Sequence, residues 1–455
     1  MTSRLREALH ETATEVPAYE LWAGALTRAR RRRRRTQVVT LILLVAVVVL
    51  VPLGWPRPDA MTVSPIQKQQ QPSLPDRVGA PRWGTATAEK KPAGRASVVF
   101  GATDWTPLGS KGELAVVGAL DDTYRLVKSN DFLYAGEQAL ISPDGTKLAV
   151  PGSVLDLETG RRKAFPLIEA DVVVPQAWSD EGRWIAVLAY RGIDEPVPAE
   201  VSLRLIDLVE GTEEFIAPLN PRTVVDGHTV AFTGNQFAYQ DGRRITVLRR
   251  SLDTGRLFKV PGGFDAPAGA RLAGKGAFLQ GGNLALLSRR DCCAGDAFTA
   301  RWQVTLVHAY NGEPRDRKFP EIPGPAAVRL LGWSPWGEPV YAAFTPAAGA
   351  EPAGFERGAG ALGLSHQGLT DPDRIGSVEV RILGQDGRQR TVLAAASGDM
   401  QSVDVADNVI ISGRMRYGHP PSGLGPYAWG IAGAGVALLA VVIALGVRRR
   451  LRRRP

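Results

Sequence analysis

The chain of 455 residues is poor in the side chains that build most catalytic sites, with two cysteines and five histidines. The cysteines, Cys292 and Cys293, are adjacent, so they lack the Cys-x-x-Cys spacing of thioredoxin-like catalysis. The histidines form neither His-Glu-x-x-His nor His-x-x-Glu-His, the patterns of zinc proteases, and Gly-x-Ser-x-Gly, a marker of serine hydrolases, does not occur. We therefore expect no enzyme, no bound metal and no cofactor.

An excess of charge is missing from the middle of the chain. The net charge is +9, but residues 1–55 hold nine arginines against four glutamates, and residues 425–455 hold six arginines and no acid. Residues 56–424 keep 40 basic and 42 acidic side chains and are nearly neutral. The basic ends give no reason to expect that the middle binds nucleic acid, so we expect no nucleic-acid partner.

Two long runs without charge stand beside these arginines. They read VVTLILLVAVVVLVPLGW (Val38–Trp55) and YAWGIAGAGVALLAVVIALGV (Tyr427–Val447). About 20 helical residues cross a hydrocarbon core, so the sequence predicts transmembrane helices at residues 37–55 and 427–447. A cleaved signal peptide is the alternative for the first run, but this run is longer than a usual signal core and no cleavage site directly follows it.

Arginine clusters beside the two runs set the expected topology. The positive-inside rule places both clusters in the cytoplasm, although contacts with anionic lipid or RNA would be an alternative role. The sequence thus predicts a plasma-membrane protein with cytoplasmic tails at 1–36 and 448–455 and an extracytoplasmic region between its two spans. The residues expected to anchor this topology are Arg30, Arg31, Arg32, Arg33, Arg34, Arg35, Arg448, Arg449 and Arg450.

Linkers are expected on both sides of a central domain at residues 96–417. Residues 56–95 are rich in proline and glutamine and lack periodicity, which is typical of an extended spacer. A shorter linker is expected at residues 418–426.

A turn followed by an apolar strand recurs through the central domain, as in ISPDGTKLAV (Ile141–Val150). Asn408 takes the turn position in the last copy, and a second family of turns, such as DLETG (Asp156–Gly160), follows later in most copies. Glycine and asparagine tolerate the positive φ of tight turns. The glycines in the turn position of the other copies are Gly112, Gly145, Gly182, Gly234, Gly282 and Gly337.

This repeat, with a mean spacing of about 49 residues and no helical periodicity, predicts an all-β fold, a β-propeller flanked by the two transmembrane helices. Seven turns favour seven blades, and six blades stay possible. The last blade has one clear strand, so we expect Ala96–Ala102 to complete it and close the ring.

The blade sequences SPDGTKLAV…VLDLETG, with looser copies in WSDEGRWIAVLAY and GWSPWGEPVYAAF, resemble the blades of TolB-like and WD-repeat propellers. The Gly-His and Trp-Asp marks of the strict WD pattern are absent, which favours the TolB-like side. This resemblance implies a binding scaffold with no defined ligand. The N-terminal tail resembles short segments of actinobacterial membrane proteins related to anti-sigma factors, but it lacks their zinc-type motif.

Three local features allow two interpretations each. Ser-Pro-Asp-Gly is either a plain turn or part of a calcium loop, and the missing Asp-x-Asp spacing favours the turn. Cys292 and Cys293 form either a strained disulfide between neighbours or two thiols. The insertion Thr345–Arg374 is either a binding loop or a tolerated insertion.

These observations favour a membrane-anchored extracytoplasmic propeller that acts as a binding or sensor scaffold. Its expected ligand is a protein, a peptide or an envelope glycan, and the N-terminal tail would contact a cytoplasmic protein. A scaffold for cell-envelope assembly without signalling is the first alternative, and a propeller enzyme without a recognisable motif is the second.

Overall fold

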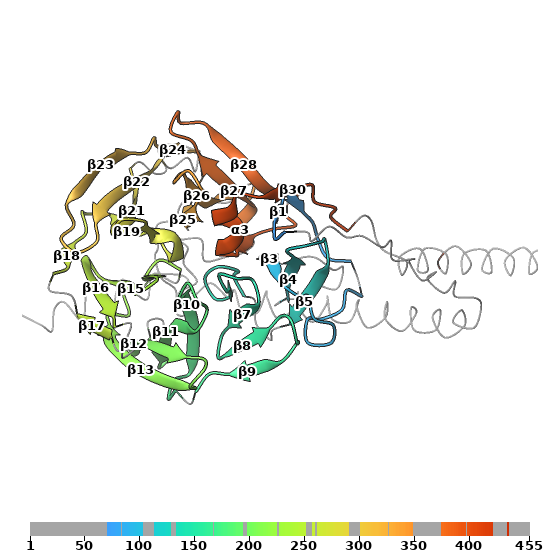
Figure 1. Cartoon of the computed structure of the whole chain (residues 1–455), viewed down its shortest axis with the longest axis horizontal. Coiled ribbons are helices and arrows are strands. Elements are labelled where there is room, and N and C mark those ends of the chain that lie inside the picture. Colours follow the sequence, from blue (N-terminus) through green and yellow to red (C-terminus); the bar gives the residue numbers. More distant parts are fainter. Residues whose placement is uncertain are drawn as a thin grey trace, which may run out of the picture. The chain divides into compact units, whose positions relative to one another are not determined.

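The computed structural model describes residues 71–421, apart from 83, 103–112, 129–132, 167, 194–197, 225–226, 252–256, 260–261, 291–300, 326, 349–374 and 397, together with Gly435. The described residues form an all-β ring of six blades, each an antiparallel sheet of at least four strands (Figure 1). The described part of the chain is therefore a six-bladed propeller.

Blades 1 to 3 follow the ring from the N-terminal side, and each is given from its first, innermost strand outward. Blade 1 contains β29 (Ser402–Val405), β3 (Ala96–Gly101), β4 (Glu113–Gly118) and β5 (Tyr124–Lys128). Blade 2 contains β6 (Leu140–Ile141), β7 (Lys147–Val150), β8 (Ser153–Asp156) and β9 (Arg162–Ala164). Blade 3 contains β10 (Val172–Trp178), β11 (Trp184–Arg191), β12 (Glu200–Asp207) and β13 (Thr212–Leu219).

Blades 4 to 6 complete the ring. Blade 4 contains β14 (Val230–Thr233), β15 (Gln236–Asp241), β16 (Arg244–Arg250) and β17 (Leu257–Lys259), with β18 (Phe264–Asp265) beside β16. Blade 5 contains β19 (Ala270–Leu272), β21 (Asn283–Arg289), β22 (Arg301–His308) and β23 (Pro314–Lys318), with β20 (Phe278–Leu279), β24 (Ile322–Pro323) and the 3-10 helix η1 (Lys275–Ala277). Blade 6 contains β25 (Ala327–Trp333), β26 (Pro339–Pro346), β27 (Ile375–Leu383) and β28 (Gln389–Ala395).

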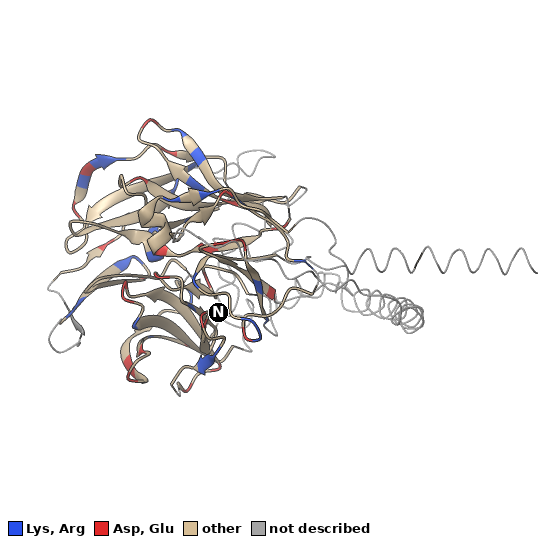
Figure 2. Cartoon of the chain, turned by 45° about the vertical axis from the view of Figure 1, so that its right-hand side comes forward, with Lys and Arg blue, Asp and Glu red and all other residues tan. Residues whose placement is uncertain are grey.

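Burial falls from the inner strands to the outer ones. In β11 the six residues Ile185–Tyr190 are all buried, whereas β9 is exposed throughout. Inner strands lie between neighbouring blades and are covered on both sides, which explains their continuous apolar runs. The outer strands carry charges of both signs, and Figure 2 shows lysines, arginines, aspartates and glutamates spread over the blades.

The turns place the strand connections on two faces of the ring. Because neighbouring strands are antiparallel, the connections from first to second and from third to fourth strand leave at one face, here called the turn face. Gly145, Gly182, Gly234, Gly282 and Gly337 lie in the turns before second strands, and all have positive φ. Gly112 lies outside the described residues.

The Ser-Pro-Asp-Gly segment is a self-bonded turn. The Asp144 carboxylate accepts hydrogen bonds from the Ser142 hydroxyl (2.7 Å) and the Thr146 amide (3.0 Å). These bonds account for the aspartate as a turn residue.

The expectation of seven blades was wrong, because the first and last repeat units belong to one blade. β29, from the C-terminal end, pairs with β3, with Ser402 opposite Gly101 and Val405 opposite Val98. β3 therefore already occupies the place of a second strand, and the residues around Asn408 form the helix α3 (Asp407–Ser412) instead of a turn and a strand. The expectation that Ala96–Ala102 closes the ring is confirmed.

The predicted transmembrane helices at 37–55 and 427–447 and the tails at 1–36 and 448–455 lie outside the described residues, except for Gly435. Within the part of the chain that the structure describes, no helix has the length and hydropathy needed to cross a bilayer.

Candidate functional site

Charged side chains and one histidine meet at the centre of the ring. We call Glu137, His228, Lys275, Arg329, Asp404 and Asp407 the central cluster. They come from the innermost strands or from the segments beside them: β25 carries Arg329, β29 carries Asp404, and η1 carries Lys275. Most inner positions are apolar, so these charges are held in the interior by specific partners.

Arg329 ties blade 6 to blade 1 and to the segment between blades 1 and 2. Its guanidinium, only 1% exposed, donates to the carbonyl oxygens of Ala135 (3.3 Å) and Val403 and pairs with Glu137 (3.4 Å). Burial lowers the pKa of Arg329 to about 10, so the group stays charged at neutral pH. A charged group that is this deeply buried needs each of these partners.

Glycines make room for this guanidinium. A Cβ atom on Gly136, which has φ of +86°, would lie 2.0 Å from Nη2 of Arg329. Gly227 and Gly274 also have positive φ, and a Cβ on either would come within 3.6 Å of the aliphatic part of Arg329. The space around the Arg329 side chain thus depends on glycine at these three positions.

Lys275, in η1 of blade 5, forms ion pairs and a hydrogen bond with the closing strand β29 and the residues that follow it. Its ammonium group lies 2.9 Å from Asp404 and 3.0 Å from Asp407, and it donates to the Val405 carbonyl (2.6 Å). Burial alone would lower the pKa of Lys275, but the two carboxylates outweigh burial and raise the pKa. The second oxygen of Asp404 accepts the Ile141 amide of blade 2 (3.0 Å).

His228 is the one imidazole of the central cluster, and burial keeps it neutral. Burial, together with the positive charges of Arg329 and Arg271, lowers its pKa to about 3, and its Nδ1 lies 3.3 Å from the Leu272 carbonyl. A general acid or base works best with a pKa near the working pH, so His228 does not fit this role at neutral pH. The central cluster acts as a set of ties between blades.

The buried neutral imidazole predicts a loss of stability in acid. Between about pH 6.5 and about pH 3 the unfolded chain binds a proton on His228 and the folded chain does not, so this residue lowers stability as the pH falls. From pH 7 to pH 5 we expect its share to be about 2 kcal/mol, since one pKa unit corresponds to about 1.4 kcal/mol. Replacing His228 with glutamine should remove that share.

The measurement is the free energy of unfolding of the full chain in detergent at pH 7 and pH 5. The variant His228→Gln is compared with His308→Gln, which changes a partly exposed histidine at the end of β22 in blade 5. An equal acid sensitivity of all three proteins would show that His228 does not contribute.

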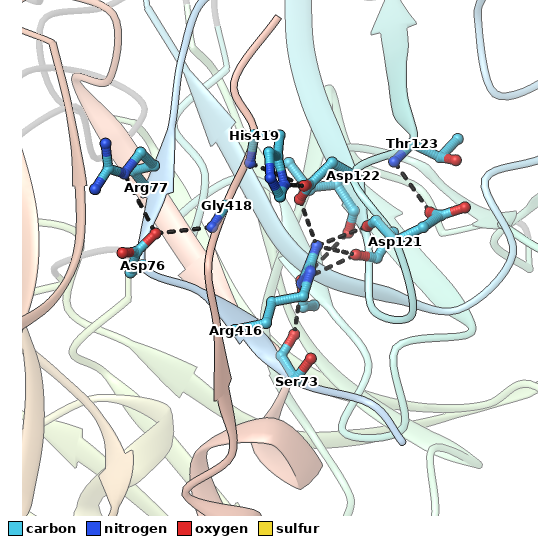
Figure 3. A network of polar contacts seen from close by, with 12 residues as sticks. Ser73, Asp76, Arg77, Asp121, Asp122, Thr123, Arg416, Gly418 and His419 are labelled. Carbon is cyan, nitrogen blue, oxygen red and sulfur yellow. Dashed lines mark hydrogen bonds and ion pairs between the residues drawn. The ribbon is translucent and has the colours of Figure 1, made fainter. Parts of the chain in front are cut away.

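A second polar network joins the two ends of the described chain. β1 (Leu74–Pro75) pairs in parallel with β30 (Met415–Arg416), and β2 (Arg77–Val78) adds to the outer strand β28. We call the residues that join these segments, Ser73, Asp76, Arg77, Asp121, Asp122, Arg416, Gly418 and His419, the terminal clasp (Figure 3).

Arg416 is the centre of the terminal clasp. Its guanidinium donates to the carbonyl oxygens of Ser73 (3.0 Å), Gly118 (2.9 Å) and Asp121 (2.6 Å) and to the Asp122 carboxylate (2.9 Å). Figure 3 shows Arg416 among Ser73, Asp121 and Asp122. The other oxygen of Asp122 accepts the backbone amide of His419 (2.8 Å). Arg416 therefore joins the C-terminal segment to the N-terminal segment and to the end of β4 with the turn after it.

Residues 71–95 of the segment expected as an extended spacer (56–95) are thus part of the propeller, apart from residue 83, which lies outside the described residues. Besides β1 and β2, Thr87 pairs with Leu126 of the outer strand β5, and the Asp76 carboxylate accepts the Gly418 amide (2.8 Å). Residues 71–95 lie against the blades and do not extend away from them.

The sequence-predicted residues and the two networks do not overlap. The glycines shape the turns, and Cys292, Cys293 and the predicted arginine anchors lie outside the described residues, as does most of Thr345–Arg374. In the described ranges no group of three histidine, cysteine, aspartate or glutamate side chains could hold a metal ion.

Sequence reasoning missed both networks, although one signal was present. Arg329 in AVRLLGW and Asp404 in SVDV are single charges in otherwise apolar inner strands. A single charge at such a position needs a buried partner.

No protein-family model and no curated protein matches the chain. Several solved structures are similar. TolB from Acinetobacter baumannii is 16% identical, with a TM-score of 0.38, over 69% of this chain and 66% of that chain, which is just under two thirds of its length. A periplasmic gluconolactonase from Pseudomonas aeruginosa is 15% identical, with a TM-score of 0.37, over 68% of this chain and 97% of that chain. An oligogalacturonate lyase in complex with manganese is 14% identical, with a TM-score of 0.37, over 70% of this chain and 77% of that chain. These identities and TM-scores are low, and the six-bladed fold rests on the strand pairing described above.

Proposed function

We propose that the chain is a membrane-anchored extracytoplasmic β-propeller that serves as a binding scaffold. The terminal clasp is the observation that supports this proposal most directly. It holds the two ends of the described chain together through the β1–β30 pair. Each end leads in sequence to an uncharged apolar run flanked by arginines. We propose that these two runs anchor the tied ends of the ring in the membrane.

The face of the ring opposite the turn face is the proposed binding surface; second strands end and third strands begin there. We propose that it takes a protein, a peptide or an envelope glycan. The N-terminal tail, residues 1–36, would carry the contact with a cytoplasmic protein if the scaffold signals.

Membrane anchoring is tested by labelling two engineered cysteines with a membrane-impermeant maleimide in intact cells. Val209 lies exposed in a turn of blade 3, so Val209→Cys should react in intact cells. Ser3→Cys should react only after permeabilisation, and the unsubstituted chain gives the background from Cys292 and Cys293. The chain should also stay in the membrane after carbonate extraction. Its release would overturn the proposal.

Signalling is tested by crosslinked co-purification from native membranes. The full chain is compared with a chain that lacks residues 2–27. A cytoplasmic protein captured only with the tail present would support a sensor. Identical captures consisting of envelope proteins would leave a scaffold without signalling.

A further inference from the structure

Arg271 brings a charge into the ring without a counter-charge. It is the second residue of β19, the innermost strand of blade 5 (Figure 1). Its Nη1 atom is buried and has no hydrogen-bond partner within the described part of the chain. Burial lowers the pKa of Arg271, and the neighbouring charge that adds to this effect is another arginine, Arg289. Because an arginine keeps its proton in a protein, this partly buried charge is held at a cost.

Arg329 shows how an arginine near the centre of this ring is held when its role is structural. It pairs with Glu137 and donates to two carbonyl oxygens. Arg271 lies close enough to His228 for its charge to lower the pKa of that imidazole, yet no carboxylate of the described residues affects the pKa of Arg271. A ligand that carries an anion would supply the counter-charge.

Strand register places Arg271 at the proposed binding surface. It lies opposite Leu287 in β21, and Arg289, two residues further on, is the last residue of that strand. Residues opposite each other on antiparallel strands point to the same side of the sheet, as do residues two apart on one strand. Arg271 and Arg289 therefore share one side of blade 5, near the end of its second strand and on the face opposite the turn face.

Positive charge exceeds negative charge on this part of the face. Arg290 follows β21 and is exposed. The acids of the neighbouring described segments already have partners, since Asp265 pairs with Arg244 (3.6 Å) and Glu321 pairs with Arg301 (3.9 Å). We call the three remaining arginines the arginine site: Arg271, Arg289 and Arg290.

The excess of positive charge is local to this part of the ring. At the corresponding ends of the strands in blade 3, Arg191 lies between Glu169 (2.9 Å) and Glu200 (3.7 Å). Complementary charge steers a partner and fixes its position on a surface. An acidic ligand would therefore be attracted to blade 5 and not to blade 3.

We propose that the arginine site binds the carboxylates of an acidic peptide segment in a partner protein. A guanidinium forms two parallel hydrogen bonds with a carboxylate, and arginine is frequent among the residues that dominate protein interfaces. Arg271 would bind one carboxylate through the accessible part of its guanidinium, and Arg289 and Arg290 would attract neighbouring ones. This inference rests on the proposed binding surface and names the chemistry of the ligand.

The surroundings of the arginine site favour a peptide over a glycan. Sugar rings are commonly bound on the face of an exposed aromatic side chain. Among the described residues, the large aromatic side chains that are exposed belong to Phe215 in the outer strand of blade 3, Trp336 in a turn on the turn face and Tyr417 beside β30. A peptide with aspartate or glutamate side chains needs no such platform.

The test measures binding of a fluorescein-labelled hexaglutamate peptide to the full chain in non-ionic detergent at low salt, by fluorescence anisotropy. We expect Arg271→Met to weaken binding about tenfold or more, the usual effect of losing a hydrogen bond between charged groups. Arg289→Met should weaken it less. The matched control is Arg388→Met, which removes an arginine that is 91% exposed on the turn face and should change binding less than about twofold. A hexaglutamine peptide should not bind.

Thermal stability separates a ligand-binding role of Arg271 from a structural one. Without peptide, Arg271→Met should raise Tm by about 1–3 °C, because it removes a partly buried charge that has no partner. A fall in Tm would show that the chain itself neutralises this arginine, and it would overturn the proposal.

Each other outcome overturns a distinct step. Equal binding of hexaglutamate to the full chain and to Arg271→Met would show that the contact lies elsewhere. If an alginate hexamer binds through Arg271 and hexaglutamate does not, the ligand is an acidic glycan and the peptide is wrong. Carbonate extraction does not involve Arg271, so an anchored chain that binds no hexaglutamate overturns the arginine site alone. Release by carbonate overturns the anchoring and leaves the peptide result standing.

Discussion

Replacing Arg329 with methionine is expected to destabilise the propeller by about 3–5 kcal/mol, the usual cost of removing one partner of a buried ion pair. The change would leave the Glu137 carboxylate, itself 1% exposed, without the guanidinium that lies 3.4 Å away. The Val403 and Ala135 carbonyls would lose the same donor. Because Val403 belongs to the closing strand β29, we expect the loss to weaken the closure of the ring.

The control is Arg381→Met, which removes an arginine that is 25% exposed and paired with Glu379 on the same strand. Its expected cost is below about 1 kcal/mol, as for other surface pairs. Thermal unfolding of the full chain in detergent, followed by tryptophan fluorescence, should show a drop in Tm of roughly 4–7 °C for Arg329→Met, given the entropy of unfolding of a domain of about 350 residues. Equal shifts for the two variants would contradict the role of Arg329. Adding Glu137→Gln to Arg329→Met should restore part of the loss.

Replacing Gly145 with alanine is expected to cost about 3 kcal/mol or more. The residue has φ of +75°, which costs an L-residue about 1–2 kcal/mol. A Cβ there would also lie 2.1 Å from the Ala96 carbonyl oxygen, and the Ala96 amide donates to the Gly145 carbonyl (2.8 Å). The clash would push the first turn of blade 2 away from β3, and overpacking of this kind adds about 1–3 kcal/mol.

Gly182→Ala is a matched control in the next blade. Gly182 holds the same turn position with φ of +65°, but a Cβ there would have no atom within 4 Å. Only the backbone cost of about 1–2 kcal/mol is expected. Unfolding free energies measured side by side separate the clash from the backbone strain. If Gly145→Ala were no worse than Gly182→Ala, the contact between the turn of blade 2 and β3 would not be tight.

Most of the fold could be predicted from the repeated turns in the sequence. The spacing of Gly145, Gly182 and Gly234 sets the hairpins, because each turn needs a residue that adopts positive φ. The blade count was missed for a different reason. Asn408 fits the turn pattern, but no strand follows it, because β3 already serves as the second strand of blade 1. The pairing of β3 with β29 joins the two ends of the domain and cannot be inferred from the residues around Asn408.

The central cluster could be located from sequence only in part. Arg329 stands alone in an apolar strand, which marks it as a buried charge in need of a partner. Its partner Glu137 lies in the segment after β5, and no local pattern links the two. Such pairs depend on which segments the closed ring brings together at its centre, and no part of the sequence alone determines this. Arg416 in the terminal clasp is similar, because its partners belong to two segments that are both about 300 residues or more away in the sequence.

The pairing of β29 with β3 also has a consequence for the time course of folding. The paired residues are roughly 300 residues apart in the chain, and contacts between such distant residues form late and slowly. Until Ser402–Val405 has been synthesised, β3 offers an unpaired edge whose six residues are all buried in the finished ring. An apolar edge of this kind readily pairs with other chains. The interval between the synthesis of blade 1 and the arrival of β29 is therefore the period in which this protein is most prone to aggregate, and a chaperone that covers β3 would act in that interval.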